Sequence, residues 1–129
     1  MNTRIIVDTS VWIEFFRKPE SGLTARLKSL LKERRVTMVG MVLAEILQGV
    51  KIRKEATLVR KSFEKLPYLE MTRDIWEKAG EISASLRNQG TTIPLSDLII
   101  AALAISNDHA IFTIDPHFKK VKGLTLYEP

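Results

Sequence analysis

The stretch IIVDTSVWIEFF, residues 5–16, decides the class of fold. Its first part, residues 5–7, is a β-branched apolar run of the kind that forms a buried strand. Asp8 follows directly, then two hydroxyl residues, and then a second apolar stretch. A carboxylate between two buried segments is costly unless it lies at the rim of the core. The organisation of the remaining chain indicates that Asp8 lies at such a rim.

Apolar runs rich in β-branched residues recur along the chain, with helical patterns between them. Further strands are predicted at residues 36–39, 110–114 and 124–127, with a weaker candidate at 68–71. The runs show no polar alternation, as expected of strands that helices cover on both faces. This order predicts an α/β fold, a three-layer α/β/α sandwich around a central, mainly parallel sheet. Ligands of such folds bind beyond the carboxyl ends of the strands, where Asp8 is expected.

The helical patterns carry their own start and stop signals. Leucines recur at helical spacing behind Ser21, a predicted N-cap, and an apolar stripe follows Thr72, a second predicted cap. Gly90 is the predicted stop of that second helix. Three more helices are predicted over residues 41–50, over residues 55–66, and from Ser96 as a cap to about Ser106.

Composition bounds the kind of protein. A chain of 129 residues with 45% hydrophobic residues suits one globular domain, residues 1–129. It has no cysteine, which excludes disulfides and thiolate metal sites and favours a cytoplasmic location. A signal-peptide pattern is absent, and the longest apolar run, residues 98–105, is far shorter than the about 20 residues that cross a bilayer. We therefore expect no membrane partner.

Two features indicate partner surfaces. The net charge of +5 favours nucleic acid or an acidic protein, and the basic segment at residues 51–65 could bind RNA phosphates or simply be a solvated helix face. Trp12, Phe15 and Phe16 are expected in the core, with the docking of an apolar partner helix as the alternative. Trp76 is assigned either to the core or to a dimer surface.

Four acids each have a purely structural interpretation when taken alone. Asp8 could cap the following helix, and Glu45 could be the exposed position of a mostly buried helix. Asp97 lies in a predicted first turn, where the helix dipole favours an acid. Asp115 precedes a proline, a common strand exit.

Their joint placement suggests a shared site. Asp8 and Asp115 each follow a predicted strand, Asp97 opens a helix, and Glu45 lies one turn into another helix. In a parallel sheet these positions fall on one edge. Clustered carboxylates repel one another, and a hard divalent cation such as Mg²⁺ or Mn²⁺ removes that conflict. Phosphodiester hydrolysis is the chemistry that suits such a site.

Four segments, taken together, resemble the PIN domain, and more narrowly the VapC-type toxins of type II toxin–antitoxin pairs. They occur in the family's order and are VDTSVWIEFF, LAEILQG, LSDLIIAALA and IFTIDPHF. The resemblance implies a Rossmann-like fold and Mg²⁺- or Mn²⁺-dependent endoribonuclease activity. It assigns the family's four metal-binding acids to Asp8, Glu45, Asp97 and Asp115. Thr9, Ser10 and Thr113 match hydroxyl positions that flank the metal site in the family.

The fourth position departs from some relatives, which have an acid directly before the phenylalanine. That slot holds His117 here, so Asp115 is expected to be a weaker or water-mediated ligand. A catalytic or substrate-contact role for His117 is left open, whereas His109 is expected to be a surface turn residue. The resemblance also implies an RNA substrate, a cognate antitoxin protein that covers the groove, and a homodimer.

Two other functions remain as alternatives. A degenerate PIN module could bind RNA or a protein without cutting, although all four acids are retained. An Asp-based phosphatase or receiver could share the α/β fold. The phosphatase needs a second acid two residues after the first, and Ser10 occupies that place.

Overall fold

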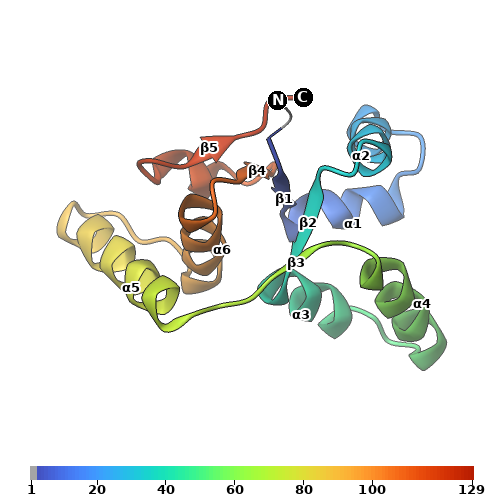
Figure 1. The fold of residues 1–129 in the computed structure, drawn as a ribbon, viewed down its shortest axis with the longest axis horizontal. Coiled ribbons are helices and arrows are strands. Elements are labelled where there is room, and N and C mark those ends of the chain that lie inside the picture. Colours follow the sequence, from blue (N-terminus) through green and yellow to red (C-terminus); the bar gives the residue numbers. More distant parts are fainter. Residues whose placement is uncertain (1–2) are drawn as a thin grey trace.

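A parallel sheet of five strands, in the order β3-β2-β1-β4-β5, forms the centre of the computed structural model, which describes residues 3–129 (Figure 1). Every neighbouring pair of strands is parallel. The bounds of the strands are β1 Ile5–Val7, β2 Val36–Val39, β3 Tyr68–Leu69, β4 Ala110–Phe112 and β5 Thr125–Leu126. All the predicted strands are present, but β3, β4 and β5 are shorter than the predicted ranges 68–71, 110–114 and 124–127.

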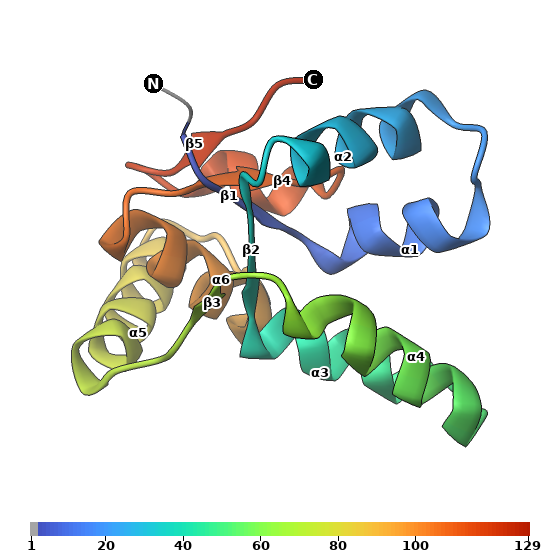
Figure 2. The same ribbon diagram turned by 45° about the vertical axis from the view of Figure 1, so that its right-hand side comes forward.

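Helices surround the sheet and complete the predicted α/β/α sandwich. Figures 1 and 2 show α5 and α6 on one side of the sheet and α1 and α2 on the other. The bounds of the helices are α1 Thr9–Arg17, α2 Gly22–Lys32, α3 Gly40–Gln48, α4 Arg53–Glu64, α5 Arg73–Asn88, α6 Leu95–Ser106 and the 3-10 helix η1 Pro116–Lys120. No helix within residues 3–129 is long and apolar enough to cross a membrane.

Two of the three predicted caps are confirmed. The hydroxyls of Ser21 and Thr72 accept the backbone N–H groups of the residues three positions on. Gly90 has φ of 81°, the left-handed conformation expected just beyond a helix end. The cap at Ser96 is wrong, because α6 begins at Leu95 and the carbonyl of Pro94 receives its first backbone bonds. Proline's fixed φ suits that extended residue before the helix.

The core explains the absence of polar alternation in the strands. All residues of β1, β2 and β4 are buried, and seven residues of α6, from Leu98 to Ala104, are buried with them. Among the described residues, Asp8 is the only charged side chain that is buried, at 5% exposure. The carboxylate that the sequence places at the end of the first strand therefore needs specific partners.

Candidate metal and active site

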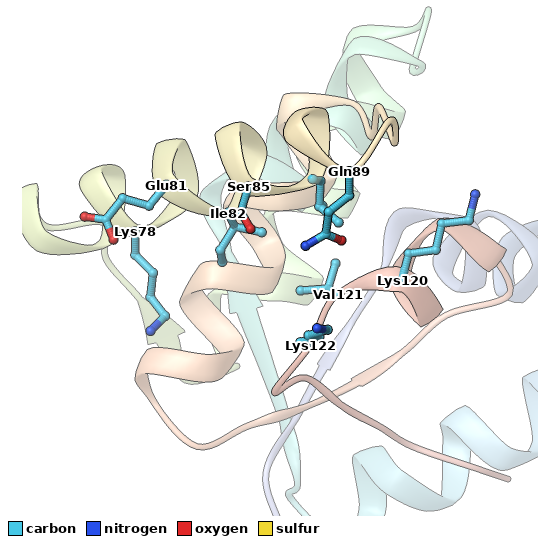
Figure 3. Close-up of a pocket in the computed structure, with 9 residues that line it drawn as sticks. Lys78, Glu81, Ile82, Ser85, Gln89, Lys120, Val121 and Lys122 are labelled. Carbon is cyan, nitrogen blue, oxygen red and sulfur yellow. The ribbon is translucent and has the colours of Figure 1, made fainter.

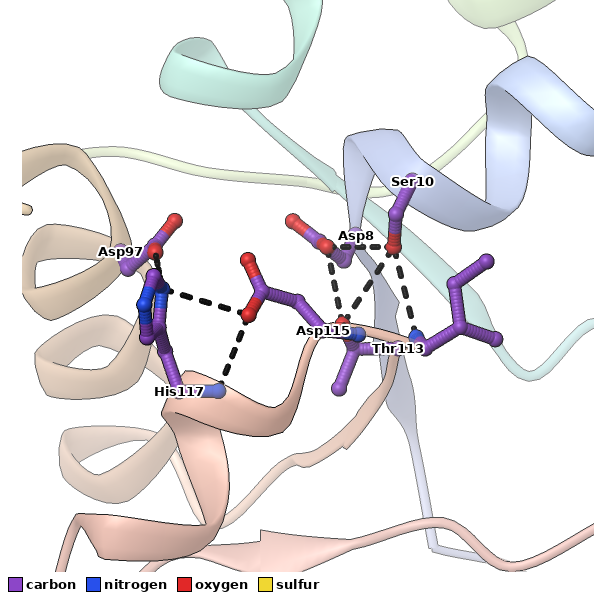
Figure 4. Close-up of polar contacts among 7 residues, drawn as sticks. Asp8, Ser10, Asp97, Thr113, Asp115 and His117 are labelled. Atoms are coloured by element: carbon purple, nitrogen blue, oxygen red, sulfur yellow. Dashed lines mark hydrogen bonds and ion pairs between the residues drawn. The ribbon is translucent and has the colours of Figure 1, made fainter.

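Asp8 lies between β1 and α1, but it does not cap the helix with its side chain. Its Oδ2 accepts hydrogen bonds from Ser10 Oγ at 2.7 Å and from Thr113 Oγ1 at 2.9 Å. The capping interpretation is therefore wrong for this residue. The carboxylate is oriented instead by two hydroxyls, one of which comes from the end of the neighbouring strand β4 (Figure 4).

Thr113 and Asp115 form the next link. The hydroxyl of Thr113 accepts the backbone N–H of Asp115 at 3.0 Å while it donates to Asp8. Asp115 in turn caps η1, because its Oδ1 accepts the backbone N–H of His117 at 2.9 Å. The structural interpretation of Asp115 is thus correct, and the same bonds place its carboxylate beside Asp8 (Figure 4).

His117 connects Asp115 with the first turn of α6. Its Nδ1 lies 3.2 Å from Asp115 Oδ1 and 3.3 Å from Asp97 Oδ2. Asp97, Asp115 and His117 offer ligand atoms that all lie within 4.8 Å of one another. Figure 4 shows the carboxylates of Asp8, Asp97 and Asp115 facing a common space, with the His117 ring at one side.

The acids at this edge repel one another. Burial raises the pKa of Asp97, and the neighbouring carboxylates of Asp115 and Asp8 raise it further, while the hydrogen bond with His117 opposes them. These causes match the conflict expected of clustered acids without a counter-ion. Carboxylate oxygens and an imidazole nitrogen are ordinary ligands of divalent ions, so the residues present fit a divalent metal.

Glu45 lies on α3 and reaches this region through one contact. Its Oε1 accepts a hydrogen bond from Thr9 Oγ1 at 2.8 Å, and Thr9 directly follows Asp8. Glu45 is half-buried, and Ala44 beside it is more exposed, so Glu45 is not the single exposed position of its helix. It is not a member of the tight group formed by Asp97, Asp115 and His117.

His117 is the residue whose place in the site was left open by the sequence. Two features of the sequence indicate a place near the site: His117 lies two residues after Asp115, and it occupies the position where some relatives have an acid. Nothing in the local pattern indicates that its ring turns toward Asp97, 20 positions earlier in the chain. That contact depends on how α6 packs against η1.

A family model described as PIN domain matches residues 5–124. The chain belongs to the PIN domain family. Ribonuclease VapC11 from Mycobacterium tuberculosis is 31% identical over 125 residues, which cover 94% of this chain and 93% of that protein.

Solved structures share the fold. A chain of the DNA-bound VapBC from Salmonella typhimurium superimposes with a TM-score of 0.83 at 19% identity, covering 98% of both chains. A chain of a toxin–antitoxin complex from Klebsiella pneumoniae gives a TM-score of 0.76 at 19% identity, covering 97% of this chain and 99% of that one. The resemblance to the PIN family and the predicted class of fold are therefore confirmed.

The aromatic residues after Asp8 divide between core and surface. In this PIN domain Trp12 is buried, and its ring centroid lies 4.8 Å from that of Phe63 on α4. Phe16 is 47% exposed and lines an open groove with Ile13 and Leu58, over α1, α3 and α4. Trp76 on α5 is 53% exposed, so of the two alternatives, core or dimer surface, the core is excluded.

A second, basic pocket lies at the far end of η1 from His117. Lys78 of α5 lines it together with Lys120 and Lys122, and one acid, Glu81, also lines it (Figure 3). The charged residues of the predicted basic segment, residues 51–65, are also exposed. Both surfaces offer cations to a polyanion without a built-in preference for sequence.

His109 is held at the opposite edge of the sheet from His117. It is half-buried, with Nε2 3.2 Å from the hydroxyl of the buried Thr37 and Nδ1 2.8 Å from the carbonyl oxygen of Asn107. The expectation of a simple surface turn residue therefore needs correction. His109 satisfies a polar group of β2 and takes no part in the acid site.

Proposed function

We propose that this PIN domain is a divalent-metal-dependent endoribonuclease and the toxin of a VapBC-type pair. The observation that carries the proposal is the convergence of Asp8, Asp97 and Asp115 on one space at the carboxyl edge of the sheet. A cluster of carboxylates at this edge, in which burial and the neighbouring acids raise the pKa of Asp97, suits a cation that neutralises it.

The proposed roles follow from the contacts of each side chain. Asp8, Glu45, Asp97 and Asp115 hold Mg²⁺ or Mn²⁺ and are the catalytic residues. Ser10 and Thr113 orient the carboxylate of Asp8, and Thr9 orients that of Glu45. When bound, the cation supplies an activated water and offsets charge on the phosphodiester and the leaving oxygen.

RNA is the proposed substrate. The net charge of +5, the exposed Lys120 and Lys122 of the basic pocket, and the exposed lysines of residues 51–65 support binding of a long polyanion. The relatives that are named ribonucleases support RNA rather than DNA.

A cognate antitoxin is the proposed protein partner. The groove over α1, α3 and α4 exposes Ile13, Phe16 and Leu58, and Glu45 also lines it. An apolar helix laid in this groove would therefore end close to one of the proposed catalytic acids. A homodimer and a cytoplasmic location are part of the same proposal, and the exposed Trp76 supports a further contact surface.

The decisive experiment measures cleavage of structured RNA by the purified chain with and without added Mg²⁺ or Mn²⁺. We expect cleavage only with metal, and loss of cleavage in the Asp8→Asn variant. Asp108→Asn is the matched control, since Asp108 lies at the opposite edge with φ of 58°, a conformation that asparagine accepts. Metal-independent cleavage, or none under any condition, would favour the degenerate binding module.

The toxin role has a separate test. Expression of the chain alone is expected to arrest growth of a host cell, and co-expression of the small protein encoded beside it to relieve the arrest. Recovery of the chain without any partner from its native operon would contradict the toxin role. Light scattering on the purified chain measures whether it forms the proposed dimer.

A further inference from the structure

We propose that His117 is a direct metal ligand through Nδ1, so that the site combines nitrogen with oxygen ligands and prefers Mn²⁺ to Mg²⁺. This inference rests on the proposed function, since it concerns the cation that Asp97 and Asp115 hold. The four acids taken from the sequence contain no nitrogen ligand. The inference therefore changes both the composition of the site and the ion that it selects.

The distances from His117 Nδ1 to the two carboxylates are the first evidence that it is a ligand. Nδ1 of His117 lies 3.2 Å from Asp115 Oδ1 and 3.3 Å from Asp97 Oδ2. Adjacent ligands around an octahedral ion with bonds of about 2.1 Å lie about 3 Å apart. The nitrogen thus has nearly the separation from both carboxylates that neighbouring ligands of one ion require. An ion bound here would lie between these three atoms, with Nδ1 unprotonated in place of its present hydrogen bond to Asp97.

Backbone contacts hold the first turn of η1, from which the His117 ring projects. The N–H of His117 donates to Asp115 Oδ1, which ties the first turn of η1 to one of the two carboxylates. The next residue, Phe118, is buried in the core and anchors the other side. The His117 side chain itself remains 42% exposed, so an ion and its water ligands can reach it.

The other histidine provides an internal contrast. Both ring nitrogens of His109 contact protein oxygens, those of Thr37 and Asn107, and neither lies near a carboxylate cluster. The chain has only these two histidines. A histidine nitrogen found on a bound metal can therefore be assigned by changing one residue.

The chemistry of the ligand atoms is the reason to expect a preference for Mn²⁺ over Mg²⁺. Mg²⁺ prefers oxygen ligands and keeps much of its water, whereas an imidazole nitrogen suits first-row transition ions. Two carboxylates and one imidazole are therefore expected to favour Mn²⁺ over Mg²⁺, relative to a site with oxygen ligands alone. Asparagine at position 117 is the informative replacement, because it is similar in size near the backbone and offers an amide oxygen in place of the ring nitrogen.

The experiment uses the full chain without RNA, loaded with Mn²⁺ and labelled with ¹⁵N-histidine. Electron spin echo modulation reports whether a histidine nitrogen is bonded directly to Mn²⁺. We expect this signal in the parent and in His109→Asn, and its loss in His117→Asn. Titrations should show that His117→Asn lowers the affinity for Mn²⁺ by at least about tenfold, the order of loss found when groups around a bound metal are changed, and the affinity for Mg²⁺ by less.

Each other outcome is informative. Mn²⁺ bound by the parent without a histidine nitrogen would overturn the inference and leave the proposed nuclease intact. Failure of the parent to bind Mn²⁺ while it binds Mg²⁺ would overturn the inference alone, and failure to bind either ion would overturn the proposed metal dependence as well. The measurement on the parent is decisive even if His117→Asn does not fold.

Discussion

The two histidines of the chain lie on either side of β4, His109 directly before it and His117 beyond its end in η1. The contacts of the two rings differ in a way that distinguishes a structural edge of the sheet from the edge with the proposed site. His109 precedes the strand and bonds to a buried threonine and a carbonyl oxygen. His117 follows it and lies between two carboxylates. One edge of the parallel sheet satisfies its polar groups, whereas the other gathers acids that repel each other. A ligand is expected at the edge with the acids, because the repulsion between their carboxylates is not balanced by the protein alone.

Asp8→Asn should have the largest effect, and it tests most directly whether the two edges of the sheet differ in function. It removes one negative charge from the proposed metal site, and we expect RNA cleavage to fall by at least about a hundredfold, more than loss of a single supporting residue costs. The Asp108→Asn variant, changed at the edge of the sheet where His109 lies, should cleave RNA at the rate of the parent. Equal losses in both variants would abolish the distinction between the edges.

Thr113→Val should have the next largest effect. It removes the hydroxyl that donates to the Asp8 carboxylate and accepts the backbone N–H of Asp115. The Asp8 carboxylate then keeps only its bond from the Ser10 hydroxyl, and the backbone that positions Asp115 loses one contact. We expect a loss of roughly ten- to a hundredfold in cleavage rate or metal affinity, as for other groups that orient metal ligands. Calorimetric titration with Mn²⁺ measures the affinity. An unchanged affinity and rate would show that the hydroxyl is only structural.

Thr37→Val tests the edge of the sheet with His109, where we expect a loss of stability and no loss of activity. Valine keeps the volume of the buried Thr37 but removes its contact with His109. We expect the free energy of unfolding to fall by about 1 kcal/mol, the typical net value of one hydrogen bond. RNA cleavage and Mn²⁺ affinity should match those of the parent. A large loss of activity at unchanged stability would connect this edge to the site after all.

The smallest expected effect is a pH dependence of stability without metal. Burial and the nearby Asp115 carboxylate hold the pKa of Asp97 above its usual value of 3.8. The folded chain therefore binds this proton more tightly than the unfolded chain, and stability from this group declines as pH rises from 3.8 through the raised pKa. Asp97→Asn should lack this decline and be as stable as the parent, or more so, at neutral pH.

Urea unfolding at a series of pH values, in the presence of a chelator, measures this effect. Added Mn²⁺ should reverse the order of stability of the two proteins, because it binds the parent, which keeps the Asp97 carboxylate, more tightly than Asp97→Asn. A parent protein that gains stability relative to Asp97→Asn over the same rise in pH would show that Asp97 is held by attractive contacts instead.

The sequence by itself determined the class of fold and most of its elements. Apolar runs gave the strands, and Ser21, Thr72 and Gly90 marked helix ends, because these signals depend on neighbouring residues alone. It also placed Asp8 and Asp115 directly after strands, which puts them at the carboxyl edge of any parallel sheet. The cap of α6 was missed, since a proline before the helix and a serine inside it give competing local signals.

Only the tertiary structure decided which side chains meet. The hydroxyl of Thr113 reaches Asp8 across 105 positions because β4 lies beside β1, and no local pattern encodes that order of strands. The ring of His117 turns toward Asp97 because η1 packs against the start of α6. Local propensity fixes where an element begins and ends. The convergence of side chains depends on strand order and helix packing, which only the folded chain as a whole provides.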